Sequence, residues 1–365
     1  MHHHKKGYII VMTMLIIGLS VAIVTYIYKR GTLYGPLAQL AAHKEKARML
    51  TQSGLQIALA QLGEPQAKKE EPQKEAQASQ KTPAAPSGSN ETALLYQTLL
   101  PRLNRWQPFD LKEEIEGVDA KIKIAIGCEE GKINLNQIYD FSKKKFRPLA
   151  DGKSDWSSLV QQLCTILEKQ SNKKELFEAF KKFLQSRAQP LNDITELLLI
   201  KEFIGFKDTI FYEPPQGGQK KEDAQTRPLY LMDIFTLYTQ DYKVDPWVFS
   251  DSLCGILGLT RAQPGDIENR SKIIEPVLKN FKSTYTWKSD WKPFLEPIYQ
   301  KELQSLPKGI ESVLQETSNP IMFSIYVSAT YGKVTQQLYA IVERTKKKDT
   351  QDPAYTVEIR KMYTL

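Results

Sequence analysis

The chain has 365 residues, of which 41% are hydrophobic and 25% are charged. These values are ordinary for a globular protein and leave room for one large or two smaller domains beside any anchor. The net charge is +8, but the basic residues are scattered. We therefore interpret the short basic runs at 143–145 and 346–348 as solvated surface rather than as a nucleic-acid-binding patch.

Histidine is absent from the chain after residue 43. The sequence beyond that point therefore has no histidine relay for a nucleophile, no imidazole base and no Cys/His zinc site. This argues against many classes of hydrolase and leaves open an enzyme that uses carboxylates alone. Three cysteines lie far apart without CxxC spacing; in an exported domain one pair could bridge, and the sequence leaves the pair open among Cys128, Cys164 and Cys254.

An uncharged, proline-free run at 8–28 follows a short basic leader. As a helix it is about 31 Å long, enough to cross a hydrocarbon core of roughly 30 Å. It is too long for the apolar core of a cleavable secretory signal, and no small-x-small cleavage site follows it. We expect a membrane-spanning helix with a cytoplasmic N-terminus, because basic residues flank the run and aromatic residues lie at its ends: Lys5, Lys6, Lys29, Arg30, Tyr8, Tyr26 and Tyr28.

The next two segments differ sharply in composition. Residues 29–62 place leucine and alanine at steps of three and four between charged residues, which predicts an amphipathic helix that continues the span, with a kink near Gly35-Pro36. Residues 63–90 contain four prolines and little that is apolar beyond alanine. Such a segment cannot bury enough surface to offset its chain entropy, so we predict a flexible linker.

The segment after the linker predicts a helix and then a β-hairpin. Leucines predict a helix at 91–105, and strict alternation predicts a half-buried strand at 118–126. A turn at 127–131 then leads to a partner strand at 132–136. We interpret the acidic residues as charged turns rather than as an acid–base or cation site, because they lack the spacing of a calcium loop: Glu113, Glu114, Glu116, Asp119, Glu129 and Glu130.

A helical block and a closing meander complete the chain. Apolar stripes predict helices from 155 to about 278, one of them capped by Asn192 or Asp193, with a polar loop at 213–227. We interpret the aromatic residues at 287–299 as packing residues. Alternation predicts strands at 321–330, 334–344 and 354–365. Closing strands after a helical block predict one sheet that is split by an insertion.

The junction between the basic leader and the apolar run resembles the cleavage site of type IV pilins and type II secretion pseudopilins. In these families a prepilin peptidase cuts after a glycine on the cytoplasmic side and leaves the helix attached. The resemblance implies that Gly7 is the last leader residue and Tyr8 the new N-terminus. Most members have a glutamate fifth after the cut, where this chain has Met12. Loss of that acid resembles the large K-type minor pseudopilin, which caps the tip of the pseudopilus.

Two further elements are similar to K-type pseudopilins. Gly131-Lys132-Ile133-Asn134-Leu135-Asn136 resembles the Gly-Lys/Arg-Phe/Ile-Asn-Leu-Asn element that ends a strand and opens the helical domain. The amides of Asn134 and Asn136 would bond neighbouring backbone there. Glu196-Leu197 matches the Glu-Leu pair of a second element, although Leu198 replaces its arginine.

Calcium is the one cofactor that the resemblance raises, because K-type members can bind it in their helical domain. The nearest oxygen-rich candidates here are Asp241, Asp245 and Asp251. They match no ligand pattern, so the metal ligands stay unassigned. No other cofactor is expected.

The order of these elements matches the K-type architecture over nearly the whole chain. We therefore expect an α+β fold, in which an N-terminal transmembrane and amphipathic helix joins a pilin-like antiparallel sheet split by a large all-α insertion. The expected segments are a leader at 1–7, a transmembrane helix at 8–28, its amphipathic continuation at 29–62, a linker at 63–90, the first part of the pilin-like domain at 91–136, the helical insertion at 137–319 and the closing strands at 320–365.

The resemblance implies a non-enzymatic minor pseudopilin at the tip of a type II secretion pseudopilus. Its expected partners are other minor pseudopilins, the major pseudopilin, the prepilin peptidase and the inner membrane, with the C-terminal domain in the periplasm and no nucleic acid. An alternative is an uncleaved, single-pass anchored periplasmic binding or scaffold protein. A third hypothesis, a nucleic-acid binder of a competence pilus, is prompted by the net charge alone and lacks a Gly-rich hairpin or clustered arginines.

Overall fold

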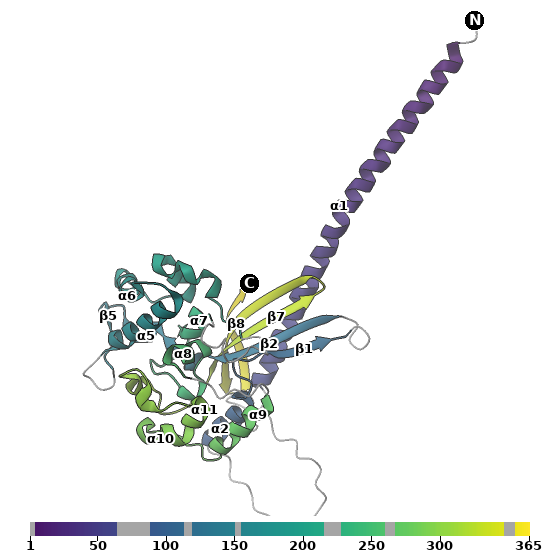
Figure 1. Ribbon diagram of the computed structural model, residues 1–365. Helices are drawn as coiled ribbons and strands as arrows, with labels where there is room; N and C mark the ends of the chain where they lie inside the picture. The colour runs from purple at the N-terminus through teal and green to yellow at the C-terminus, as the bar shows by residue number, and fades with distance from the viewer. Residues whose placement is uncertain are drawn as a thin grey trace, which may run out of the picture.

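The structure is a computed structural model that describes residues 4–63, 88–112, 119–149, 155–214, 228–259, 267–346 and 355–365. Most of the predicted linker, most of the polar loop after 213 and most of the acidic segment at 113–119 lie outside the described residues. A single long helix, α1 (His4–Gly63), projects from a globular head that contains the other elements (Figure 1).

The helix α1 has an exposed half and a packed half. Residues 11–42 are exposed apart from Leu33, whose side chain is not described, and Pro36 lies inside the helix without interrupting it. The two predicted helical segments are thus one continuous helix, which runs through Gly35-Pro36, where we predicted a kink. From His43 onward one face packs on the sheet, and its buried residues recur at helical spacing: Ala47, Thr51, Gly54, Leu55, Ala58 and Leu62.

A five-stranded antiparallel sheet forms the centre of the head. Its strand order is β1-β2-β7-β8-β9, and the strands span Gln107–Leu111, Ala120–Cys128, Met322–Tyr331, Val334–Lys346 and Tyr355–Thr364. The predicted closing meander is confirmed by β7, β8 and β9. The short strand β1 was not predicted, because Pro108 and its few residues give no clear alternation.

The two faces of this sheet hold two different bodies. Successive side chains of a strand point to opposite faces. On β7, Val327 faces α1, while Ser324 and Tyr326 face the other way. The insertion, residues 129–321, separates β2 from β7 in sequence, and its described parts pack against this second face (Figure 1). Together with the long N-terminal helix and the antiparallel sheet, this arrangement confirms the predicted α+β fold.

The inserted segment is mainly helical and contains two pairs of two-residue strands. Residues 88–111 precede it, with α2 (Gly88–Leu99) shorter than the predicted helix. In chain order its elements are η1 (Glu129–Gly131), β3 (Ile133–Asn134), α4 (Leu135–Ile138), β4 (Tyr139–Asp140), β5 (Lys145–Phe146), α5 (Trp156–Ser171), α6 (Leu176–Ser186), η2 (Ile194–Leu199), η3 (Lys201–Thr209), α7 (Leu231–Ile234), β6 (Phe235–Thr236), η5 (Pro246–Val248), α8 (Asp251–Leu257), α9 (Ile267–Leu278), α10 (Trp287–Phe294), α11 (Glu296–Tyr299), η6 (Leu303–Ser305) and η7 (Ile310–Val313).

The predicted hairpin between 118–126 and 132–136 is wrong. The strand β3 has two residues and pairs in parallel with β6, whereas β2 pairs with β1 and β7. The 3-10 turn η1 carries the chain off the end of β2. The strand that pairs there is β7, which begins only at Met322. The predicted capped helix after Asn192 is a 3-10 helix, η2, with Asp193 as its N-cap.

Candidate functional site: the exposed helix and the polar joint

The exposed half of α1 is the largest apolar surface that the described residues leave uncovered. In the described part of the chain, one helix is long and apolar enough to cross a membrane, and none of its apolar window is buried in the head. Gly7 and Tyr8 lie in its first turns. The Met12 side chain is 51% exposed, and the exposed side chains beyond it include Leu15, Ile16, Leu19, Ile23 and Ile27. A surface of this size requires lipid or other helices around it.

The apolar surface extends past the predicted span. Tyr34, Leu37 and Leu40 are each more than half exposed, although they lie between the basic pair at 29–30 and the head. Twelve or so residues of helix rise about 18 Å, so this part of α1 separates the head from the candidate span. Because these side chains are exposed, they are available to a partner helix.

The packed half of α1 fixes the direction of the helix relative to the sheet. A Cβ atom on Gly54 would lie 2.6 Å from Val327 Cγ1 and 2.9 Å from Ile122 Cγ2, so only glycine allows the helix to approach this closely. At the end of α1, Arg344 Nε donates to the Leu62 carbonyl oxygen at 2.8 Å. At the other end of the contact, Lys46 Nζ lies 3.0 Å from the Tyr331 hydroxyl.

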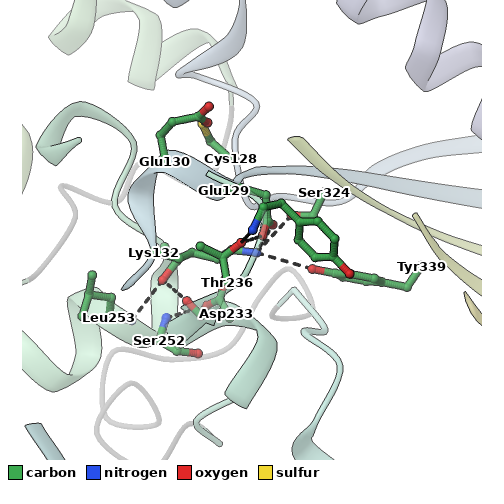
Figure 2. Close-up of polar contacts among 12 residues, drawn as sticks. Cys128, Glu129, Glu130, Lys132, Asp233, Thr236, Ser252, Leu253, Ser324 and Tyr339 are labelled. Atoms are coloured by element: carbon green, nitrogen blue, oxygen red, sulfur yellow. Dashed lines mark hydrogen bonds and ion pairs between the residues drawn. The ribbon is translucent and has the colours of Figure 1, made fainter. Parts of the chain in front are cut away.

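On the opposite face, a buried group of polar side chains joins the insertion to the sheet (Figure 2). We call it the polar joint: Cys128, Glu129, Glu130, Lys132, Asp233, Thr236, Ser252, Ser324 and Tyr339. Lys132, whose side chain is 1% exposed, forms an ion pair with Glu129. Its ammonium group also lies 3.3 Å from Ser324 Oγ on β7 and 3.4 Å from the Tyr339 hydroxyl on β8. The first residues of the insertion are thus bonded to two strands of the sheet.

Glu129 and Glu130 bind different parts of the molecule. Thr236 of β6 donates its hydroxyl to Glu129 Oε2 at 2.5 Å. Glu130 Oε1 accepts the backbone N–H groups of Ile321 and Met322, at 3.0 and 2.8 Å, where the chain returns to the sheet. The residue pair that leaves β2 therefore also holds the entry to β7. Our interpretation of these glutamates as a charged turn is wrong, because both are buried.

Three buried carboxyl groups around this joint have raised pKa values. Burial raises the pKa of Glu130 to about 7. Burial also raises the pKa of Asp233 to about 6, against the opposing effect of Lys132. Burial raises the pKa of Asp245 to about 6, although Tyr96 and Ser318 donate hydrogen bonds to it. Burial disfavours the charged form of each acid, so these groups oppose folding once they ionise.

The Lys132 ammonium group is held in its charged form. Burial alone lowers its pKa, but Glu129, Tyr339 and Asp233 raise it more, so the net pKa lies above its usual value. Because Lys132 stays charged, Glu129 has a permanent counter-ion within the joint. Because this ion pair is deeply buried, removing one member leaves the other as a buried charge without a counter-ion.

Each residue of the Gly131–Asn136 motif has a structural position beside the joint. A Cβ atom on Gly131 would lie 1.8 Å from the Val248 carbonyl oxygen, so the backbone of η5 passes where any side chain would be. Asn134 caps α4 by accepting the Asn136 and Gln137 N–H groups, and its Nδ2 lies 2.6 Å from the Thr239 carbonyl oxygen. The Leu135 side chain is fully buried.

Asn136 and the Glu196-Leu197 pair extend this network outward. Asn136 exchanges two hydrogen bonds of 2.9 Å with the backbone of Leu191. Glu196 closes a capping box with Asp193, and Leu197 is fully buried. Asp193 in turn binds the Tyr363 hydroxyl at 2.7 Å and Lys361 Nζ at 2.9 Å on β9. The bonds of Asn134 and Asn136 thus stay within the insertion, where both amides pair with backbone, and Asp193 supplies the contact with β9.

The three candidate calcium ligands are engaged separately. Asp245 is buried with Tyr96 and Ser318, while Asp251 accepts the Tyr212 hydroxyl at 2.7 Å. Asp241 is exposed and accepts the Lys243 N–H. Among the described residues, no group of three His, Cys, Asp or Glu side chains could hold a metal ion. Calcium binding stays a prediction without assigned ligands.

The three cysteines are buried free thiols in three separate elements: Cys128 in β2, Cys164 in α5 and Cys254 in α8. Cys128 donates its thiol to Glu130 Oε2 at 3.1 Å. The pairing that the sequence left open is therefore not formed in this structure.

Sequence reasoning missed the polar joint as a unit. The signal was present, because two acids directly follow the apolar end of a strand, at 124–128, and a lysine follows two residues later. Charged residues at such a position are usually solvated, and only the tertiary structure shows that residues 233–252 and 321–324 cover them.

No protein-family model matches the sequence, and no curated protein matches it. Among solved structures, one chain of the GspK-GspI-GspJ complex from the type 2 secretion system of enterotoxigenic Escherichia coli is similar to this chain. The two chains are 11% identical with a TM-score of 0.37, over 76% of this chain and 92% of that chain. This likeness by itself assigns neither a function nor a partner.

Proposed function

We propose that this chain is a minor pseudopilin of a type II secretion system, of the K type, with a structural rather than an enzymatic role. The observation that carries the proposal is α1, a single helix whose exposed half has the length and hydropathy of a membrane span and whose packed half is built into the sheet. A helix shared in this way moves together with the head. That property suits a subunit that is lifted out of a membrane into a filament.

The mechanism is assembly through α1. Before assembly the apolar half lies in the inner membrane, with its N-terminus in the cytoplasm and the head in the periplasm. During assembly the helices of other pseudopilins replace the lipid around it. Lipid tails and helix surfaces are similarly apolar, so this exchange is driven by packing and polar contacts rather than by a new hydrophobic effect. The exposed Tyr34, Leu37 and Leu40 supply contact area beyond the membrane.

Two features favour a place at the tip. Met12 stands where most pseudopilins have an acid that bonds the amine of the preceding subunit, a partner that a tip subunit lacks. The insertion is attached to the sheet through hydrogen bonds: Lys132 donates to Ser324 and Tyr339, and Glu130 accepts the Met322 N–H. A bulky body held this firmly beside the sheet would prevent another subunit from stacking above it.

The test is the intact mass of the protein from membranes, with and without an active prepilin peptidase. We expect loss of residues 1–7 and a methylated Tyr8 amine only when the peptidase is active. Gly7→Val should abolish cleavage. Gly31→Val is the matched control, because Gly31 lies in the same helix with nothing near its missing Cβ atom. An uncut N-terminus in every sample would contradict the proposal and leave the uncleaved, anchored binding protein.

The place at the tip has a separate test. A label on the head, viewed on isolated filaments, should mark one end. Labels that repeat along the filament would exclude the tip role and leave a pseudopilin of another kind.

A further inference from the structure

The two edges of the five-stranded sheet differ in their protection. At one edge, β1 has five residues and contains Pro108. At the other edge, β9 has ten residues and no proline. Short length and proline are two ways in which proteins stop an edge strand from pairing with another chain. Among the strands that the structure describes, none pairs with the outer side of β9.

The pairing of β8 with β9 shows which backbone groups of β9 face the open side. Arg344 on β8 donates its N–H to the Ile321 carbonyl oxygen at 2.7 Å, away from β9. Its partner Val357 therefore directs its own N–H and C=O away from β8, because these groups alternate along an antiparallel pair. Ile359 lies two residues further and has the same direction.

The second half of β9 also presents backbone groups to the open side. Leu365 donates its N–H to the Gln337 carbonyl oxygen at 3.0 Å, so it faces β8. By alternation, Thr364 faces outward and so does Met362, after the register shift in the middle of the strand. The open edge thus offers the donors and acceptors of four residues, in two alternating pairs that the register shift separates.

Apolar side chains accompany this row. Ile359 is 45% exposed and Met362 is 51% exposed, and both lie on the face of the sheet that also holds α1. The charged residues of β9 do not guard the edge, because Arg360 is paired with Glu343 and Lys361 with Asp193. An exposed edge with apolar side chains and compensated charges is a site for pairing with another strand.

We propose that the outer edge of β9 binds an extended strand of another pseudopilin, which continues the sheet and covers Ile359 and Met362. Only an extended backbone matches alternating N–H and C=O groups, and its own apolar side chains would fall on the α1 face. The choice of a pseudopilin rests on the proposed function. The end of α1 lies against the start of β9, since a Cβ atom on Gly63 would be 3.8 Å from Val357 Cγ2. A subunit whose helix follows α1 therefore brings its head beside this edge.

The first test places a photo-crosslinking amino acid in the full chain, in membranes that contain the complete secretion system. The position is Met362, with Leu94 as the matched control, because Leu94 is an apolar side chain of similar exposure on α2. We expect an adduct with another pseudopilin from position 362, identified by mass spectrometry of the adduct, and none from position 94. An adduct with a second copy of this chain, or with no pseudopilin, would overturn the proposal.

The second test is hydrogen exchange of the mature, unsubstituted protein with and without the purified partner that the crosslink identified. The amides of Val357, Ile359, Met362 and Thr364 should exchange about tenfold or more slowly in the complex, since each gains a partner. The amides of the alternate residues, which already face β8, should change less. The exchange measurement uses the unsubstituted protein, so it does not depend on whether a variant folds.

A variant sharpens the second test. Ile359→Pro removes an N–H on the open side without removing a bond to β8, so it should weaken the complex by about tenfold or more. Ile359→Val keeps the N–H and should have little effect. If the complex forms while the four outward amides stay unprotected, the edge proposal is wrong and the proposed function stands. If the N-terminus is uncut and no pseudopilin binds, both are wrong.

Discussion

The two faces of the central sheet attach their partners by different physics. On one face α1 lies against an apolar surface, at a distance set by Gly54, and the contact contains little polar bonding in the middle. On the other face the insertion is joined through Lys132, Glu129 and Glu130, which form hydrogen bonds with β6, β7 and β8. Close packing holds α1 by the fit of its surface to the sheet, whereas the insertion also has directional bonds.

This difference shows which contacts orient α1 and which orient the insertion relative to the sheet. Small residues let α1 approach the sheet closely, and polar bonds to Leu62 and Tyr331 occur only near the two ends of the contact. The insertion contacts the sheet through aromatic side chains such as Phe211, and it adds hydrogen bonds from buried charged residues to β7 and β8. We infer that the polar joint determines the pose of the insertion and that shape determines the pose of the helix.

The largest expected effect comes from breaking the ion pair of the polar joint. Lys132→Met leaves Glu129 buried without its counter-ion and should lower the free energy of unfolding by about 3–5 kcal/mol. The measurement is urea unfolding of the full chain in detergent, followed by tryptophan fluorescence. All five tryptophans lie in the head, between residues 106 and 291, so the signal reports the head alone.

A double variant distinguishes an unpaired charge from lost packing. Lys132→Met with Glu129→Leu replaces both charges by apolar side chains and should recover most of the lost free energy of unfolding. If the double variant is as unstable as the single one, the ion pair is not the cause, and the joint is held by the other hydrogen bonds.

The next effect is a fall in stability as the pH rises. The pKa values of Glu130, Asp233 and Asp245 are raised in the folded state, so the protonated acids favour folding. This contribution is complete below their unfolded pKa values, near pH 4, and is lost as the pH rises through about 6 to about 7. For Glu130 alone the free energy of unfolding should fall by roughly 3 kcal/mol across this window.

Glu130→Gln isolates that group from the other titrating residues. The amide oxygen still accepts the Ile321 and Met322 N–H groups but carries no charge at any pH. Urea unfolding midpoints of both proteins, measured from about pH 4 to about pH 8, should converge at low pH and separate at high pH, with the variant more stable. Parallel curves would show that Glu130 does not titrate in this range.

The sequence predicted the framework of the fold because its signals are local. The apolar run, the alternation at 321–344 and the stripes of the helical block each act within a few turns or one strand, so α1, β7, β8 and most helices could be placed. The partner of β2 could not, because pairing with β7 joins residues about two hundred positions apart and leaves no periodic signal.

The candidate site divides in the same way. The junction at Gly7 and the exposed apolar helix follow from the sequence, and so does the capping role of Asn134. The burial of Lys132 and Glu129 could not be predicted, since it depends on β6, β7 and β8 meeting around them. Buried charges contradict the local preference for water, and only tertiary contacts compensate them.

The smallest of these effects tests the helix side of the comparison. Gly54→Val places a branched side chain where Val327 and Ile122 already lie within 2.9 Å of the Cβ position. Overpacking should lower the free energy of unfolding by about 1–3 kcal/mol, because neither neighbour is a flexible chain end. The measurement is the same urea titration of the full chain in detergent.

Gly31→Val is the matched control for this contact, since it makes the same change in the same helix with nothing within 4 Å of the Cβ position. It should change the free energy of unfolding of the head by less than about 0.5 kcal/mol. Equal losses in both variants would mean that valine disturbs the helix itself. A loss at residue 54 alone would show that the distance between helix and sheet is what the glycine sets. Shape would then orient the sheet on α1, whereas the buried charged residues of the polar joint orient the insertion on the sheet.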